Sequence, residues 1–368
     1  MRYAPARGNT PGIHDLVLET ETKVIRGEAC AAAAQTLRDQ GLRPDLICVH
    51  PGWGEGLFLK HVWPDTPMLC YQEFWYNTEG FDVGFDPEWP SAERDWETGC
   101  RIQMKNAYLH LMFGEADWNI TPTTFQRSSF PQPYQQRLSV IHDGIDCSQS
   151  CPNPDPAPLE LGHSIRLEPG DRLVTFVNRR LEPYRGCHTF IRALPELQRL
   201  QPEARIVVVG ETSGVSYGRP CPEGEWKELF LKEIEGDYDP SRVNFIGNIP
   251  HHAFTRLLQL SACHVYLTYP FVLSWSLLEA MSCGCAVVGS RTAPVEEVIR
   301  DGHNGVLVDF FKPGDLASAV SDLLENRALA QQLGRAARQT IQARFDLRTC
   351  LPRQLALMDL VANRALPD

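Results

Sequence analysis

The sequence predicts an α/β protein built from two doubly wound domains. The chain has 368 residues, which is more than a single hydrophobic core usually holds. Strand-like apolar runs alternate with helix-like segments over most of it, the pattern of parallel sheets with helices on both faces. Between the two halves lies segment 151–158, whose four prolines can continue neither a helix nor a central strand. We therefore expect one domain over residues 1–155 and another over residues 156–345.

The first domain opens with a helix, a turn and a buried strand. Arg43, Pro44 and Asp45 make the turn, and an apolar run follows it directly. The elements expected are helix 28–40, strand 46–50, strand 67–72, a helix over about 91–114, strand 118–121, and a strand at 140–141 that leads into a turn at 143–146.

The second domain alternates strand and helix more regularly, which favours a parallel sheet. Its predicted strands are 173–177, 205–209, 243–246, 264–268, 286–289 and 305–308. Its predicted helices are 188–199, 225–235, 253–261, 275–282, a short one at 294–299, and two that start at 316 and 329.

Composition and charge narrow the class of protein. Hydrophobic residues make up 43% and charged residues 22%, as in globular proteins that fold in water. The net charge of -11 disfavours a nucleic-acid partner, because a phosphate backbone demands a basic face. The sequence contains no signal-peptide core or membrane span, so we expect a cytoplasmic protein. The twelve cysteines show no zinc-ligand spacing with histidines, and we expect them to be reduced.

An arginine-rich turn follows the first predicted strand of the second domain. It contains Arg179, Arg180 and Arg185, and Gly186 precedes the next helix. Ligands of doubly wound sheets bind beyond the carboxyl ends of the strands, and guanidinium groups match the oxygens of a diphosphate. The alternative is a solvated run of charge around an ordinary turn. The position after the strand favours a phosphate site.

A second candidate site lies at the start of the predicted helix 275–282. Ser274 fits the N-cap position, and the first amides of a helix attract anions. Glu279, more than a turn further on, can direct a carboxylate at vicinal hydroxyls such as those of a ribose. The alternative is a buried amphipathic helix with one glutamate at its solvent edge.

Together these two motifs resemble the family 4 retaining glycosyltransferases of the GT-B fold. After a strand the family has an arginine and a leucine, and then a lysine followed by a glycine. Arg180 corresponds to the arginine, and Arg185 and Gly186 correspond to the lysine and glycine. Arg179 is an alternative match for the arginine. The resemblance covers residues 173–345, and its matching segments are 180–186, 245–250, 278–288 and 297–305.

The resemblance implies two Rossmann-like domains that face a cleft, and a last helix over 346–368 that crosses back to the first domain. It implies catalytic roles for Arg180 and Arg185. The donor-binding residues that it implies are Arg179, Gly210, Asn248, Ile249, Phe271, Val272, Leu273, Ser274, Ser276, Leu277 and Glu279. Phe271 departs from the family, whose paired glutamates stand eight positions apart. Backbone amides at 272–274 would take over part of the missing carboxylate's role.

The first domain resembles the family through the strand 44–50 and the turn 143–146, and it lacks a counterpart of the family's first strand. Where the family often has a histidine after the next strand, this chain has Glu73. A carboxylate at that place could take a proton from an acceptor hydroxyl. The alternative is a loop glutamate paired with a cation. The expected acceptor-side residues are His50, Gly52, Trp53 and Gly54.

The resemblance implies transfer of a hexosyl group, with retention, from a nucleoside diphosphate sugar to a glycan or lipid-linked acceptor. A UDP-sugar is favoured. Because arginines neutralise the diphosphate, we expect no metal ion and no other cofactor. Peripheral association with the inner face of a membrane stays open. The alternatives are a nucleotide-sugar-binding scaffold without activity and a sugar-nucleotide epimerase of the same fold.

Overall fold

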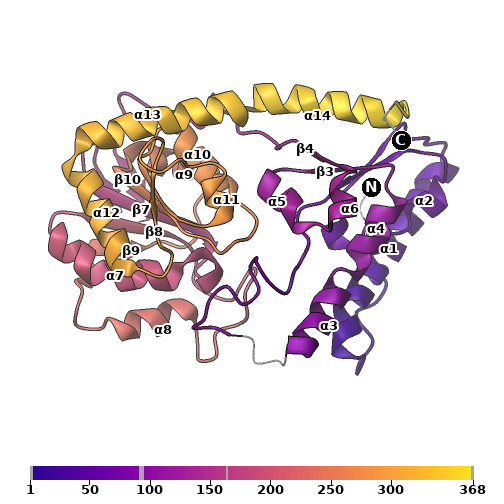
Figure 1. The fold of residues 1–368 in the computed structure, drawn as a ribbon, viewed down its shortest axis with the longest axis horizontal. Coiled ribbons are helices and arrows are strands. Elements are labelled where there is room, and N and C mark those ends of the chain that lie inside the picture. Colours follow the sequence, from indigo (N-terminus) through magenta and orange to yellow (C-terminus); the bar gives the residue numbers. More distant parts are fainter. Residues whose placement is uncertain (1–2, 91–94, 163–164, 366–368) are drawn as a thin grey trace. The chain divides into compact units, whose positions relative to one another are not determined.

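A computed structural model describes residues 3–90, 95–162 and 165–365 of the chain (Figure 1). The chain divides into two compact units, Met1–Asp143 with Cys350–Asp368, and Gly144–Thr349. We call these the first unit and the second unit. Within the described ranges, no helix is both long enough and apolar enough to cross a membrane.

The first unit contains a parallel sheet in the order β1-β2-β3-β4, formed by Ile47–Val49, Met68–Tyr71, Trp118–Thr121 and Leu138–Val140. One face packs on helices with Met68 and Cys70, while Leu69 points into the other core with Leu357 and Val361 of the last helix. The helices are α1 (Asp15–Asp39), η1 (Pro51–Trp53), α2 (Leu59–Val62), α3 (Asp95–Lys105), α4 (Ala107–Glu115), α5 (Thr124–Ser129), α6 (Gln132–Gln135) and α14 (Leu347–Ala362).

The second unit contains a six-stranded parallel sheet in the order β12-β11-β10-β7-β8-β9. Because the chain reverses its direction of strand addition between β7 and β10, the carboxyl ends of these two neighbours form the topological switch point where ligands bind. The strands are β7 (Leu173–Arg180), β8 (Arg205–Glu211), β9 (Val243–Phe245), β10 (Cys263–Tyr266), β11 (Val287–Ser290) and β12 (Val306–Val308), with a separate hairpin β5 (Leu159–Leu161) and β6 (Ile165–Leu167).

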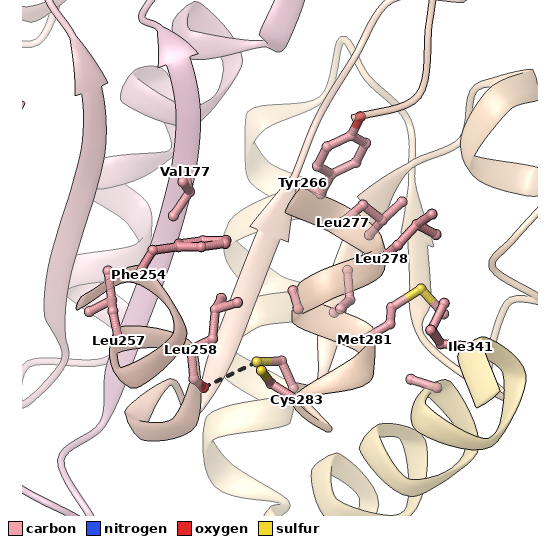
Figure 2. Packing of buried hydrophobic residues seen from close by; sticks show 14 of the residues in the cluster. Val177, Phe254, Leu257, Leu258, Tyr266, Leu277, Leu278, Met281, Cys283 and Ile341 are labelled. Atoms are coloured by element: carbon pink, nitrogen blue, oxygen red, sulfur yellow. Dashed lines mark hydrogen bonds between the residues drawn. The ribbon is translucent and has the colours of Figure 1, made fainter. Parts of the chain in front are cut away.

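Helices surround this sheet and hold its carboxyl edge in place. Figure 2 shows Val177 of β7 and Tyr266 of β10 in one apolar core with side chains from α9 and α10, such as Phe254 and Met281. This packing fixes where both helices begin. The helices are η2 (Pro183–Arg185), α7 (Cys187–Leu200), α8 (Trp226–Glu233), η3 (Pro240–Arg242), α9 (His251–Leu260), α10 (Trp275–Ser282), α11 (Ala293–Glu296), α12 (Pro313–Glu325) and α13 (Arg327–Arg344).

The elements differ from the sequence expectations mainly in the first unit. Helix α1 begins at Asp15 rather than at 28. The helix expected over 91–114 is two helices, α3 and α4, and residues 91–94 lie outside the described residues. The break falls at Asn106, whose side chain bonds both the carbonyl and the amide of Tyr76. These two bonds join the junction between α3 and α4 to the segment that follows β2.

The chain passes from one unit to the other at residues 143/144 and 349/350. The domain boundaries predicted from the sequence were at 155 and 345. The reason is a short pairing between the two connecting segments. The amide of Ile145 donates to the carbonyl of Phe345 at 2.7 Å, and the amide of Leu347 donates to the carbonyl of Ile145 at 2.9 Å. Arg338 also donates to the carbonyl of Cys147 at 3.2 Å. These bonds attach Ile145 and Cys147 to the second unit.

We predict that Gly186→Ala destabilises the second unit. Gly186 has a φ of 67°, and a Cβ there would lie 2.4 Å from Cβ of Leu267. Strain and overlap together should lower the free energy of unfolding by about 2 kcal/mol, measured by denaturant titration. Gly314→Ala is the control, because a Cβ there meets no atom within 4 Å. Equal unfolding midpoints for the two variants would contradict this explanation.

We also predict that buried His264 makes the second unit sensitive to acid. Its Nδ1 lies 2.9 Å from Oγ1 of Thr175, and burial lowers the pKa of the imidazole to about 3. The unfolded chain takes up this proton near pH 6.5, so stability is lost as the pH falls below that value. The stability of the native protein relative to His264→Leu should drop by about 2 kcal/mol between pH 7.5 and pH 5. A difference that stays constant with pH would refute the assignment.

Candidate donor and acceptor sites

Arg185 is the last residue of η2, beyond the carboxyl end of β7, and it is 5% exposed. Its Nη1 donates to the Oγ1 of Thr268 at 2.8 Å, to the carbonyl of Val272 at 3.0 Å and to the hydroxyl of Tyr266 at 3.3 Å. Within the described part of the chain, its Nε and Nη2 make no hydrogen bond. The guanidinium is therefore held in place by one nitrogen while its other donors stay available to an anion.

The start of α10 lies at the same place. The amide of Ser274 donates to the hydroxyl of Tyr266 at 2.8 Å, and its Oγ accepts from the amide of Ser276 at 3.3 Å. Ser274 is thus the N-cap of α10, as the sequence predicted. Because Tyr266 contacts both Arg185 and Ser274, the cation and the helix start lie at one edge of the sheet.

A pocket of about 370 Å³ opens beside this edge. Glu279 lies one turn into α10, and its Oε1 is 2.6 Å from Nε2 of His251. Its side chain is 16% exposed. The residues that line the pocket are Val177, Asn178, Arg179, Val209, Asn248, Ile249, His251, Phe254, Ser274 and Ser276. Five of the donor-binding residues predicted from the sequence are among them: Arg179, Asn248, Ile249, Ser274 and Ser276.

The remaining arginine and the adjacent turns have other contacts. Nη1 of Arg180 contacts the carbonyl of Ser213, while Arg179 on the alternate side of the strand lines the pocket. The amide of Gly210 donates to the carbonyl of Gly247 at 3.0 Å, which joins the ends of β8 and β9. Of the two adjacent arginines, the structure therefore directs Arg179 rather than Arg180 to the pocket.

Three predicted donor residues are buried in the protein itself. Leu277 is 0%, Phe271 4% and Leu273 5% exposed. The ring of Phe271 lies 6.0 Å from the guanidinium carbon of Arg185 and 5.2 Å from the ring of Tyr217. Their side chains pack inside the second unit next to the site.

A loop at residues 216–218 covers Arg185, and it was not predicted from the sequence. Glu182 is 0% exposed, and its carboxylate accepts from the amides of Ser216, Tyr217 and Gly218 at 3.1, 3.2 and 2.9 Å. These bonds hold the ring of Tyr217 at 5.0 Å from the guanidinium carbon of Arg185, within cation–π range. No sequence pattern predicts the contact between Tyr217 and Arg185. Tyr266 and Thr268 could have been found, because polar side chains near the end of the predicted strand 264–268 indicate residues that contact the site.

In the first unit, His50 directly follows β1, and Glu73 lies two residues after the neighbouring strand β2. Nε2 of His50 lies 3.6 Å from Oε2 of Glu73, whose side chain is half-exposed. Nδ1 of His50 accepts from the amide of Gly52 at 3.1 Å, and its ring stacks on Tyr71 at 5.6 Å. The hydroxyl of Tyr71 donates to Asp143 at 2.7 Å. Burial and this carboxylate raise the pKa of Tyr71.

The glycine-rich turn after His50 exposes an aromatic ring. Trp53 is 57% exposed, and the Nζ of Lys23 and the guanidinium carbon of Arg26 lie 5.9 and 5.6 Å from its ring. Gly54 has a φ of 89°, and a Cβ there would lie 2.6 Å from the Cα of Lys23. The predicted acceptor-side residues His50, Gly52, Trp53 and Gly54 therefore form one turn next to Glu73.

Comparison with known proteins identifies the class. Residues 1–149 match the family model described as glycosyl transferase family 4 group, and residues 163–340 match that of glycosyl transferases group 1. A GDP-mannose-dependent alpha-(1-6)-phosphatidylinositol monomannoside mannosyltransferase of Mycolicibacterium smegmatis is 29% identical over 274 residues, which cover 70% of this chain and 65% of the relative. A D-inositol 3-phosphate glycosyltransferase 2 of Catenulispora acidiphila is 27% identical over 82% of this chain and 68% of its own length.

Solved structures agree on the architecture. Sucrose-phosphate synthase of Thermosynechococcus elongatus matches with a TM-score of 0.70 and 18% identity over 99% of this chain and 83% of its own. Anabaena HepE, solved with UDP-glucose, matches with a TM-score of 0.63 and 17% identity over 90% and 82%. The chain spans 44% to 65% of the length of the first curated relatives. Sequence families and fold together lead to one assignment: the chain belongs to the family 4 glycosyltransferases and has their GT-B fold.

Proposed function

We propose that the chain transfers a hexosyl group from a nucleoside diphosphate sugar to a glycan or lipid-linked acceptor, with retention at the anomeric carbon. The observation that supports it best is the meeting of Arg185 and the start of α10 around the hydroxyl of Tyr266. A UDP-sugar is the favoured donor, since a protein of this fold has been solved with UDP-glucose. GDP-mannose is the second candidate, because a relative depends on it.

The proposed chemistry on the donor side is electrostatic. When the anomeric bond breaks, negative charge develops on the leaving diphosphate. The free nitrogens of Arg185 and the first amides of α10 lie where they would stabilise that charge as it forms. The guanidinium is already fixed by three acceptors, so little reorganisation is needed. We propose that these groups act without a metal ion.

The proposed sugar-recognition and acceptor chemistry rests on carboxylates. Glu279 would accept hydrogen bonds from the ribose hydroxyls at the edge of the pocket. Phe271 supplies no carboxylate to the donor sugar, and the backbone amides at 272–274 would take part of that role. On the acceptor side, Glu73 would take the proton of the attacking hydroxyl, with His50 beside it at 3.6 Å.

A second candidate function is nucleotide-sugar binding without transfer. Phe271, buried beside Arg185, favours it, because the family's first glutamate is missing at that position. An epimerase of the same fold is the enzymatic alternative, and it would convert one sugar nucleotide into another without an acceptor and without net release of nucleoside diphosphate. Donor turnover separates these functions.

We predict that Arg185→Ala reduces release of nucleoside diphosphate from a UDP- or GDP-sugar at least 100-fold. The loss of a preorganised cation typically costs about 3 kcal/mol of transition-state stabilisation. Arg199→Ala is the matched control, because Arg199 is exposed and, among the residues that the structure describes, its ion-pair partner is Glu196 at 2.5 Å. A metal chelator should leave the native rate unchanged. Binding of nucleotide without turnover of any donor would favour the scaffold instead.

We predict that Glu73→Gln removes sugar transfer and preserves donor binding. The amide has nearly the same shape but cannot accept a proton, so kcat should fall about 100-fold or more. Nucleotide affinity, measured by calorimetry, should stay within a factor of two. Glu79→Gln, at an exposed position of the following loop, is the control. Unchanged kcat in Glu73→Gln would rule out a catalytic carboxylate at this position.

A further inference from the structure

His251 is the hydrogen-bond partner of the carboxylate assigned to the ribose. Its Nε2 lies 2.6 Å from Oε1 of Glu279, within hydrogen-bond distance. The Glu279 side chain is 16% exposed and that of His251 is 61% exposed. Within the described part of the chain, the second oxygen of Glu279, Oε2, makes no hydrogen bond. One carboxylate oxygen is therefore engaged by the protein and the other is available.

The two residues come from helices whose starts are fixed by the same core. His251 is the first residue of α9, directly after Pro250, and it lines the pocket. Glu279 lies in the second turn of α10, and helical side chains lean toward the N-terminus, here toward Ser276 in the pocket wall. In Figure 2, Phe254 of α9 and Leu278 of α10 belong to one packed cluster.

The turn that carries His251 is held from its other end as well. Nδ2 of Asn248 donates to Oε2 of Glu211 at 2.8 Å, at the end of β8. The amide of Gly210 donates to the carbonyl of Gly247 at 3.0 Å, which joins the same turn to β8. The turn 247–251 is thus anchored to the sheet before it reaches Glu279. A fixed imidazole can hold a carboxylate in one rotamer.

We propose that His251 is the positioning residue of the ribose site: it fixes Glu279 so that its free oxygen meets a ribose hydroxyl. This inference rests on the proposed function, since Glu279 is assigned to the ribose there. A glutamate side chain loses rotamer freedom when it engages a ligand, and a bond made beforehand reduces that cost. His251 would therefore contribute to affinity for ribose nucleotides without being required for the bond-breaking step.

The test measures coupling between His251 and one ligand hydroxyl. Dissociation constants are determined by calorimetry for UDP, GDP and their 2′-deoxy forms, with the native protein and with His251→Ala, His251→Gln and Glu279→Ala. We expect the native protein to prefer the ribose form about 10-fold, as for one charged hydrogen bond. His251→Ala should reduce that preference to about 2-fold, and Glu279→Ala should abolish it. His251→Gln should restore it, because the amide N–H can replace the imidazole donor.

Controls separate this inference from the function on which it rests. His252→Gln alters the neighbouring exposed histidine and should behave like the native protein. In steady-state assays His251→Ala should raise the KM for the donor and leave kcat within a factor of two. If His251→Ala weakens ribose and deoxyribose forms equally, or keeps the native preference while Glu279→Ala loses it, the inference is wrong and the function stands. If the native protein binds neither UDP nor GDP, the proposed function fails and the inference fails with it.

Discussion

The donor side depends on one buried hydroxyl at the end of β10. Tyr266 accepts the amide of Ser274 at 2.8 Å and contacts Nη1 of Arg185 at 3.3 Å. Burial raises the pKa of this phenol, so it stays neutral and keeps its proton at physiological pH. Because β10 is the direct neighbour of β7, a single side chain joins two segments that are far apart in sequence. The phosphate chemistry proposed for the chain uses this junction.

The rule that ligands bind beyond the carboxyl ends of parallel strands predicted which segments of the second unit lie at the candidate donor site. It works because parallel strands bring their carboxyl ends to one edge of the sheet. Arg185 and Ser274 each follow a predicted strand, so this rule predicts that both lie at one edge of the sheet. It could not distinguish Arg179 from Arg180, because successive residues of a strand face opposite sides and a turn motif does not reveal which side holds the ligand. The donor-binding role of Leu277 came from the family resemblance, and its side chain is buried in the core.

Helices and strands without a clear periodic pattern of apolar residues were predicted less completely. The first half of α1 is polar and poorly amphipathic, so only its alanine-rich second half was predicted. The short helices α5 and α6 and the hairpin β5–β6 carry too few residues for a periodic signal. In the first unit, Glu73 and His50 were both predicted, but their proximity follows from the pairing of β1 with β2. The contact between His251 and Glu279 was not predicted, because the two residues are 28 positions apart and no sequence pattern connects them.

The carboxylate of Glu182 binds three consecutive amides at 216–218, and this arrangement does not depend on which side chains the loop carries. Because the bonds are made by backbone amides, they can persist when side chains of the loop are substituted. Residues beyond Gly218 can diverge or change in number among descendants of this sequence while Tyr217 stays over Arg185. Replacing the residue at 217 accordingly changes the ring that covers Arg185 while the three backbone bonds to Glu182 remain.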